Sequence, residues 1–349
     1  MFDETKENSI EKELSKCSRC GLCLENCPIY SIKKDENNTS RGLICKLSGY
    51  KKGILTEKEV KKGLKICLNC TKCKSGCPSL VDTTSVFAYK NALLNPSLFS
   101  QRIFLILKLL PLKLVYILNF FKSKPKTKKS DILYFKGCVA KAQHKKTYLD
   151  KLFFNPEFSC CGLPYLTSGD IKNYKKAKEK NISLINSAKL VVFDCASCKK
   201  AVEEYKNTDK SKLLFFNDLI ENKIKIKDNS KYKNKTITFH KPCHMDENEF
   251  LRTEEFLKNI NGINYKRLEN YSDCCGFGGS YFIFHPIIST KIALKKAKNI
   301  KITNPDLILT VCPSCTLGLR FNQLISFNFK KTLELRDFID KETEIKEQD

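Results

Sequence analysis

The sequence is poor in histidine and has no hydrophobic segment at its start. Only four of its 349 residues are histidine, so a catalytic cysteine would find few bases to activate it. The opening stretch, MFDETKENSIEKELSKC, is polar and charged, unlike a signal peptide. We therefore expect a cytoplasmic protein, in which thiols stay reduced and structural disulfides are rare.

The sequence also lacks a dinucleotide-binding fingerprint. The glycine-rich stretch GFGGS at 276–280 has neither the strand-to-helix context nor the downstream acidic residue that such a site requires. We expect any flavin or nicotinamide chemistry to take place on another chain.

The charge is strongly basic, with 63 lysine and arginine residues against 38 acidic residues. Such an excess indicates nucleic-acid binding when the basic residues form a patch. Here the lysines are scattered, and no basic patch alternates with aromatic residues. We expect lysine spread over solvated faces and no nucleic-acid partner.

Cysteine is abundant, with 19 residues, which in a reducing compartment indicates metal binding. Two runs, CSRCGLCLENCP at 17–28 and CLNCTKCKSGCP at 67–78, have the spacing C-x2-C-x2-C-x3-C-P of bacterial ferredoxins. Zinc sites instead favour CxxC pairs with longer spacers. Three thiols on one tight loop reach one cluster, and the fourth faces the other cluster. We therefore expect two [4Fe–4S] clusters, held by Cys17, Cys20, Cys23 and Cys77 and by Cys67, Cys70, Cys73 and Cys27.

Changes in composition and in hydrophobic patterning divide the chain into four parts. Residues 1–95 contain both cysteine runs, and residues 96–130 combine an apolar stretch with a lysine-rich linker. From residue 131, strand-like runs (DILYF, AKLVVFD, KTITFH, DLILTV) alternate with charged helical patterns. The predicted domains are therefore 1–95, 131–230 and 231–349, joined by 96–130.

Residues 131–349 contain an internal repeat of cysteines, which indicates two copies of one structural unit. Each copy has a lone cysteine after a strand, a CCG triplet, a helix, and CxxC after a second strand. Zinc would leave one of five cysteines unused, a vicinal disulfide would be strained, and five soft ligands suit a polynuclear iron–sulfur centre. The two sets are Cys138, Cys160, Cys161, Cys195 and Cys198, and Cys243, Cys274, Cys275, Cys312 and Cys315.

Three further residues near these motifs have open roles. His244 follows Cys243 and would serve either as a proton donor or as a packed surface residue. His240 is the weaker candidate. Cys45 has no partner at ligand spacing and is expected to be a buried apolar residue. The glycine of each CCG triplet is expected to let the backbone approach the metal centre closely.

These motifs together resemble a known family. KCSRCGLCLENCPIY, CLNCTKCKSGCPSLV, CCGLPYLTSGD, DCASC, HKPCHM, CCGFGGSYF and VCPSC are similar to the iron–sulfur subunits of glycolate oxidase, anaerobic glycerol-3-phosphate dehydrogenase, lactate oxidation and heterodisulfide reductase. The resemblance implies an α+β/α/β fold class: a helical, bacterial-ferredoxin-like two-cluster domain followed by two repeated α/β CCG domains. It also implies one or two further iron–sulfur clusters at the CCG sites, which in heterodisulfide reductase relatives are noncubane [4Fe–4S] clusters.

The stretch IFLILKLLPLKLVYILNFF at 103–121 leaves two alternatives open. Its length permits a membrane span, but Lys108 and Lys113 near its middle oppose one, and Pro111 indicates a bend. Five lysines follow within 122–129 and would suit an anionic membrane surface. The segment is therefore either an interfacial anchor or a pair of packed helices.

The family resemblance implies an electron-transfer subunit on the inner face of the cytoplasmic membrane. An FAD-containing partner would oxidise a 2-hydroxy acid such as glycolate or lactate, and electrons would pass to quinone or another acceptor. The alternative is a catalytic subunit that reduces a disulfide at a noncubane CCG cluster.

Overall fold

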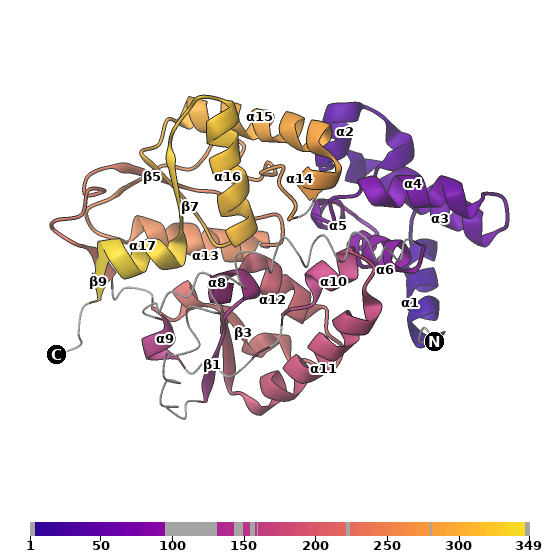
Figure 1. Ribbon diagram of the computed structural model, residues 1–349, viewed down its shortest axis with the longest axis horizontal. Helices are drawn as coiled ribbons and strands as arrows, with labels where there is room; N and C mark the ends of the chain where they lie inside the picture. The colour runs from indigo at the N-terminus through magenta and orange to yellow at the C-terminus, as the bar shows by residue number, and fades with distance from the viewer. Residues whose placement is uncertain are drawn as a thin grey trace.

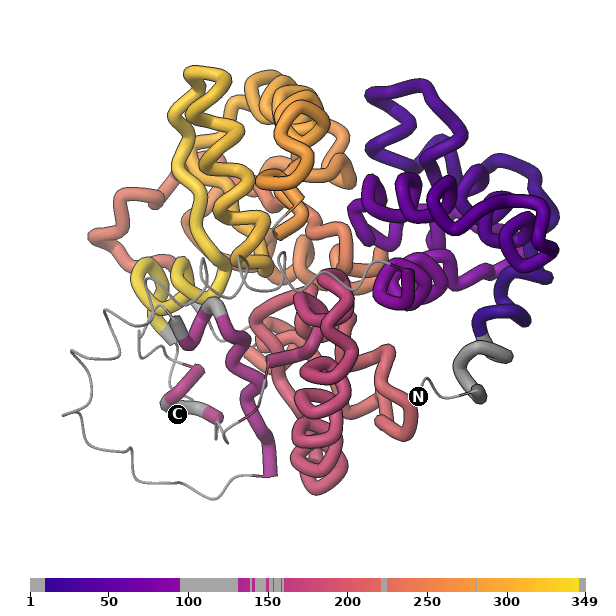
Figure 2. The backbone as a smooth tube through the Cα atoms, turned by 45° about the vertical axis from the view of Figure 1, so that its right-hand side comes forward, coloured from indigo at the N-terminus to yellow at the C-terminus, as the bar shows by residue number. Residues whose placement is uncertain are grey.

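The computed structural model describes residues 4–94, 131–142, 149–153, 158, 160–220, 224–279 and 281–345. These residues form three lobes, one N-terminal and helical and two built on parallel sheets (Figures 1 and 2). The stretch 103–121 and the linker that follows it lie outside the described residues. Among the helices that are described, none combines the length and apolar character that a membrane crossing requires.

The N-terminal lobe is helical throughout its described part and packs around one small core of Leu43, Leu47, Val60 and Leu64. Local signals set its helix starts: Pro28 is the first residue of α2, and Thr56 and Glu59 form a capping box at the start of α4. Its helices are α1 (Glu4–Ser15), α2 (Pro28–Lys33), α3 (Ser40–Lys51), α4 (Glu57–Ile66), α5 (Lys72–Ser75) and α6 (Thr83–Leu94).

The first α/β lobe contains a parallel sheet in the order β1-β2-β3. Its strands are β1 (Ile132–Phe135), β2 (Leu190–Phe193) and β3 (Leu213–Phe215), and they are apolar because they are largely buried. Its helices are α8 (Cys138–Ala142), α9 (Leu149–Leu152), α10 (Leu163–Thr167), α11 (Ile171–Ser187) and α12 (Ala196–Glu203).

The second α/β lobe repeats this plan with a parallel sheet in the order β6-β5-β7-β8. Its strands are β5 (Thr236–Phe239), β6 (Asn264–Tyr265), β7 (Leu307–Thr310) and β8 (Lys331–Glu334). Its helices are α13 (Glu247–Lys258), α14 (Tyr281–Phe284), α15 (Pro286–Thr303), α16 (Pro313–Ile325) and α17 (Leu335–Glu342).

The two α/β lobes are joined through one continuous hydrophobic core. The backbone N–H of Ala196 donates to the carbonyl of Val311 over 2.9 Å, and the buried side chain of Arg336 forms an ion pair with Asp194. In addition, β4 (Ile224–Ile226) pairs antiparallel with β9 (Thr343–Ile345), so a pairing crosses the boundary predicted near residue 230. That boundary stays a prediction.

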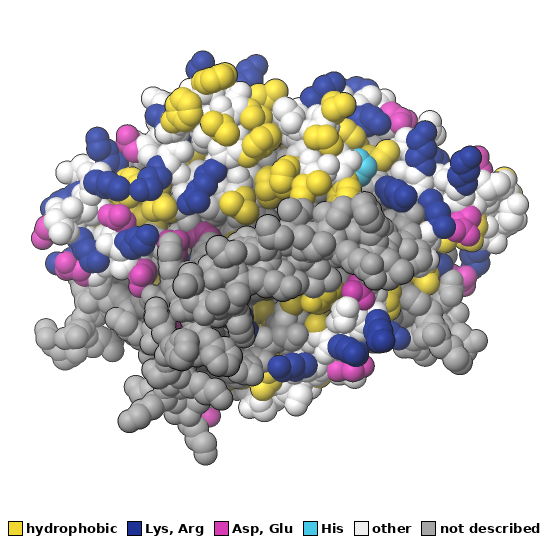
Figure 3. All heavy atoms as spheres, in the orientation of Figure 1, with side chains coloured by type: hydrophobic (Ala, Val, Ile, Leu, Met, Phe, Trp, Pro, Cys, Tyr) yellow, Lys and Arg dark blue, Asp and Glu magenta, His cyan; other side chains and the backbone are white. Residues whose placement is uncertain are grey.

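Basic side chains on the face seen in Figure 3 are interspersed with acidic and apolar ones. On the described part of this face, the basic side chains are distributed as the sequence predicts, without a single basic patch.

Candidate metal centres

Two cavities in the helical lobe are lined by cysteines from both ferredoxin-type runs. Each cavity takes three cysteines from one run and the last cysteine of the other. One is lined by Cys17, Cys20, Cys23 and Cys77, and the other by Cys27, Cys67, Cys70 and Cys73. These are the two crossed groups that the spacing predicts, brought together in space. Four thiols around one cavity are the donor set that a [4Fe–4S] cluster takes.

The two cavities differ in how far their thiols are removed from water. Cys20 is exposed, and its pKa is lowered by a hydrogen bond from the backbone of Leu22. Burial raises the pKa of Cys67 to about 12, and it also raises that of Cys73. Burial also raises the pKa of Cys23 in the first cavity, so metal binding would displace protons from buried thiols at both cavities.

In the α/β lobes, the lone cysteines and the CxxC pairs follow the carboxyl ends of parallel strands. Cys195 follows β2 and is the N-cap of α12, and Cys312 follows β7 and is the N-cap of α16. The second cysteine of each pair, Cys198 or Cys315, lies in the first turn of the same helix. A helix N-terminus stabilises a thiolate, because its free N–H groups and dipole favour negative charge.

Thiol contacts connect the second cavity to both CCG sites. The neighbouring Cys243 thiol raises the pKa of Cys70, and Cys275 and Cys315 have their Sγ atoms 3.6 Å apart. Cys195 of the first site interacts with Cys312 of the second. The full series of neighbouring thiols is Cys70, Cys243, Cys274, Cys275, Cys315, Cys312, Cys195, Cys198, Cys161, Cys160 and Cys138.

Two hydrogen-bonded contacts fix the helical lobe against the second CCG site. Thr71 Oγ1 donates to the carbonyl of Cys243 over 2.9 Å. The ring of His244 bridges Ser197 Oγ, at 2.9 Å from Nδ1, and the carbonyl of Asn69, at 2.8 Å from Nε2. Both nitrogens of His244 are thus used to hold segments together, which favours the packing role over the proton donor.

Comparison with protein families matches three parts of the chain. The model of the 4Fe-4S dicluster domain matches residues 13–81, and that of the cysteine-rich CCG domain matches residues 132–203 and 237–320. The chain therefore has a 4Fe-4S dicluster domain followed by two CCG domains. The thiol-lined sites of this iron–sulfur protein fit such clusters, because every cysteine of the matched motifs lies beside another of its set or lines a shared cavity.

Curated relatives support this assignment over most of the chain. A probable glycolate oxidase iron-sulfur subunit of Bacillus subtilis is 25% identical, over 91% of each chain. A component of the dihydromethanophenazine:CoB–CoM heterodisulfide reductase of Methanosarcina barkeri is 27% identical, over 88% of each chain. Lactate utilization protein A of Shouchella clausii is 29% identical over 46% of this chain and 73% of its own.

The glycine of each CCG triplet is required by its local packing, and its expected role in bringing the backbone close to a metal centre stays a prediction. Gly162 and Gly276 adopt left-handed conformations, with φ of +80° and +82°. A Cβ at Gly276 would lie 2.7 Å from the carbonyl oxygen of Ser289, and one at Gly162 would lie 2.7 Å from the ring of Tyr174. The glycines therefore allow a tight turn against α15 and α11, which is a packing role within the CCG domain.

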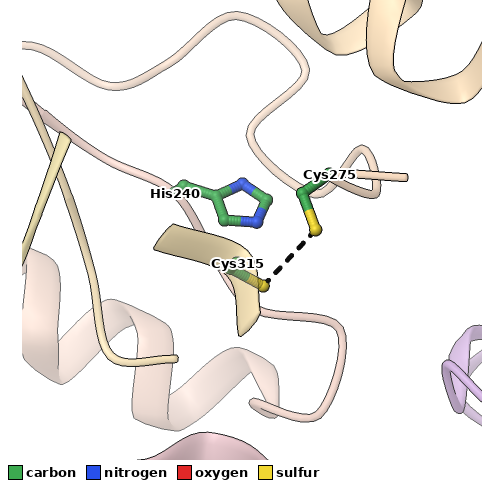
Figure 4. Close-up of side chains that lie close together, drawn as sticks. All are labelled: His240, Cys275 and Cys315. Atoms are coloured by element: carbon green, nitrogen blue, oxygen red, sulfur yellow. Dashed lines mark hydrogen bonds between the residues drawn. The ribbon is translucent and has the colours of Figure 1, made fainter. Parts of the chain in front are cut away.

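His240 is the residue of this iron–sulfur protein that sequence reasoning undervalued. Its side chain is fully buried, and its ring points toward Cys275 and Cys315 (Figure 4). Its place at the carboxyl end of β5 was a usable signal, since ligand-binding residues gather at that edge of a parallel sheet. Cys45, in contrast, lies on α3, is half-buried rather than buried, and lines neither of the two cavities.

Proposed function

We propose that the chain is an electron-transfer subunit in which the dicluster domain, the second CCG site and the first CCG site follow one another. The observation that carries the proposal is the unbroken series of neighbouring thiols from Cys70 to Cys138. Iron–sulfur clusters bound at such sites would supply one-electron carriers. Carriers bound at these sites would lie next to one another in the fold.

The ligand sets of the dicluster domain are proposed to be the two groups of four cysteines that line the two cavities. The groups are supported by their shared cavities and by the spacing of bacterial ferredoxins. At the CCG sites, the ten cysteines of the two repeats are proposed as ligands. Most of these ten thiols are buried, so the protein would keep water away from the centres and limit their oxidation.

The donor and acceptor are proposed from the relatives. An FAD-containing dehydrogenase for a 2-hydroxy acid, of glycolate or lactate type, would deliver electrons, and a quinone or another carrier would accept them. The names of the Bacillus and Shouchella relatives support this choice. We further propose a cytoplasmic protein that is peripheral to the membrane.

Metal analysis of anaerobically purified protein tests this proposal. Each [4Fe–4S] cluster contributes four irons, so we expect about eight or more irons per chain, with matching sulfide. Copurification with a flavoprotein that reduces the clusters on addition of glycolate or lactate is the second expected result. Stoichiometric zinc with little iron would contradict the proposal.

A second candidate function is reduction of a disulfide at the CCG sites. It is favoured by the proximity of the two sites, since Cys195 of one neighbours Cys312 of the other, and by the heterodisulfide reductase relative. The two sites together would present a two-electron reductant to one disulfide bond. Formation of two thiols per disulfide by the reduced, isolated chain would support this function, whereas electron transfer without thiol formation would support the first.

A further inference from the structure

The environment of His240 is unusual for a core histidine. The residue follows β5, and its side chain has no exposed surface. Neither Nδ1 nor Nε2 makes a hydrogen bond of standard geometry among the described residues, and the thiol with which the ring interacts is that of Cys275. Burying polar atoms without partners costs about 1–3 kcal/mol per group, so native structures rarely retain them without a reason.

The atoms nearest to this ring are the thiols of the second CCG site. One ring nitrogen of His240 and the Sγ atoms of Cys275 and Cys315 all lie within 4.8 Å of one another (Figure 4). Metal–sulfur bonds of about 2.3 Å and metal–nitrogen bonds of about 2.0–2.1 Å fit inside a triangle of that size. The cluster contains no carboxylate, so its donors are of the type that soft and borderline metals prefer.

At the position equivalent to His240, the first CCG domain has no histidine. The residue that follows β1, at the position equivalent to His240, is Lys136, and its Nζ lies 2.8 Å from Asp150 Oδ2. That lysine is therefore held in an ion pair. The two CCG sites share their cysteine pattern, but among the described residues only the second offers a nitrogen donor.

We propose that His240 binds the metal of the second CCG centre through a ring nitrogen, so that this centre has mixed cysteine and histidine ligation. The inference rests on one part of the proposed function, namely that the second CCG site holds a metal centre. A neutral imidazole adds no negative charge, and histidine ligands raise the reduction potential of iron–sulfur centres relative to thiolates alone. The second centre would therefore be the more readily reduced of the two.

A buried lysine would also raise the reduction potential of the second centre. Lys296 is fully buried, and its Nζ donates to the carbonyls of Asn270 and Tyr271 over 3.2 and 3.0 Å. It thus holds the loop that leads to Cys274. Its positive charge would stabilise additional negative charge on a reduced centre nearby.

The experiment uses full-length, anaerobically purified protein labelled with 15N at histidine only. The second centre is brought to a paramagnetic state by stepwise reduction and studied by electron–nuclear double resonance. We expect a strong 15N coupling, of the size that a directly bonded nitrogen gives. The coupling should disappear in His240→Gln and persist in the matched control His285→Gln, because His285 contacts the carbonyl of Lys65 and lies outside the CCG cysteine sets.

A redox titration of the same samples measures the reduction potential of the second centre, which a merely structural role of His240 would not change. We expect a lower reduction potential for the second centre in His240→Gln, and recovery of the nitrogen coupling when imidazole is added to His240→Gly. Weak or absent coupling in the wild-type protein would overturn the inference and would indicate hydrogen bonding to sulfur or simple packing. That measurement needs no variant to fold.

The same samples separate this inference from the proposed function. If the iron content and the dicluster signals are intact but no nitrogen couples strongly, only the role of His240 fails. If iron is present for the dicluster domain alone, the second centre does not exist and the His240 inference falls with it.

Discussion

In the first CCG domain, Cys138 and Cys160 are 22 positions apart and both are half-buried, whereas in the second, Cys243 and Cys274 are 31 positions apart and Cys274 is buried. The second site also has the buried ring of His240 beside its thiols. The two CCG domains thus share one cysteine pattern, but the residues around their cysteines differ.

The difference extends to what each site contacts. The second site neighbours Cys70 of the dicluster domain, and Thr71 and His244 reinforce that junction. The series of thiols reaches the first site only after passing through the second, by way of Cys312 and Cys195. Position in the molecule, more than the cysteine pattern, therefore distinguishes the roles of the two sites.

The largest effect that we predict comes from removing one CCG centre at a time. Cys275→Ser should eliminate the second centre and slow the reduction of the first by the dicluster clusters at least about tenfold. The matched variant Cys161→Ser should eliminate the first centre and leave the second fully reducible. Rapid-mixing reduction followed by freeze-quench spectroscopy measures both. Equal behaviour of the two variants would contradict the proposed order.

Breaking the ion pair that joins the two domains should have the next largest effect. Asp194 precedes the first CxxC pair, and Arg336 lies on α17 of the second domain; both side chains are almost fully buried. Arg336→Met would remove the cation beside Asp194 and also beside Glu334, a buried carboxylate of its own domain, although the hydroxyl of Tyr134 would still donate to Asp194. The free energy of unfolding should fall by about 3–5 kcal/mol. Urea unfolding under anaerobic conditions, followed by circular dichroism, tests this.

A control for that measurement is available on the surface. Lys233→Met removes an ion pair with Asp228, whose side chain is 86% exposed. Its loss should cost less than about 1 kcal/mol. Similar losses of stability in the two variants would show that the buried pair does not join the domains.

A smaller effect should distinguish the glycines of the two CCG triplets. Gly276→Ala places a Cβ against backbone, the carbonyl of Ser289, whereas Gly162→Ala places one against the side chain of Tyr174. Both variants lose about 1–2 kcal/mol to the left-handed conformation, and Gly276→Ala should cost more because backbone cannot move aside as a ring can. Thermal unfolding measures the difference.

A substitution at Gly279 measures the loss of stability that comes from the left-handed backbone alone, without a steric contact. It has φ of +66°, and no atom lies within 4 Å of the position that a Cβ would take there, so Gly279→Ala should show only the left-handed penalty. A Gly276→Ala variant no less stable than Gly279→Ala would contradict the packing role of the CCG glycine.

Local patterns made much of this molecule predictable from the sequence. The crossed grouping of the ferredoxin-type cysteines follows from spacing within two short runs, and the predicted strand runs coincide with β1, β2, β5 and β7. The short strands β3 and β8 were not predicted, because their neighbours in the sheet, not their own few residues, define them. The roles of 96–130 stay predictions.

At the metal sites, the sequence predicts the cysteines that fall in short motifs, but not the side chains that reach a site only through the fold. His240 was ranked below His244, although it is His240 that faces the thiols and His244 that bridges two segments. The two residues flank Cys243 closely, and only the turn after β5 decides which ring points inward. Such a decision depends on tertiary packing that the sequence pattern does not contain.

The pairing of β4 with β9 has a consequence for how the protein is made. Residues 224–226 form an antiparallel pair of strands with residues 343–345, which leave the ribosome more than a hundred residues later. Domains generally fold as units during synthesis, from the N-terminus onward, but this segment cannot complete that pairing until residues 343–345 have been made. The pairing can therefore form only after the cysteines of both CCG sites, which lie between residues 138 and 315, have been made.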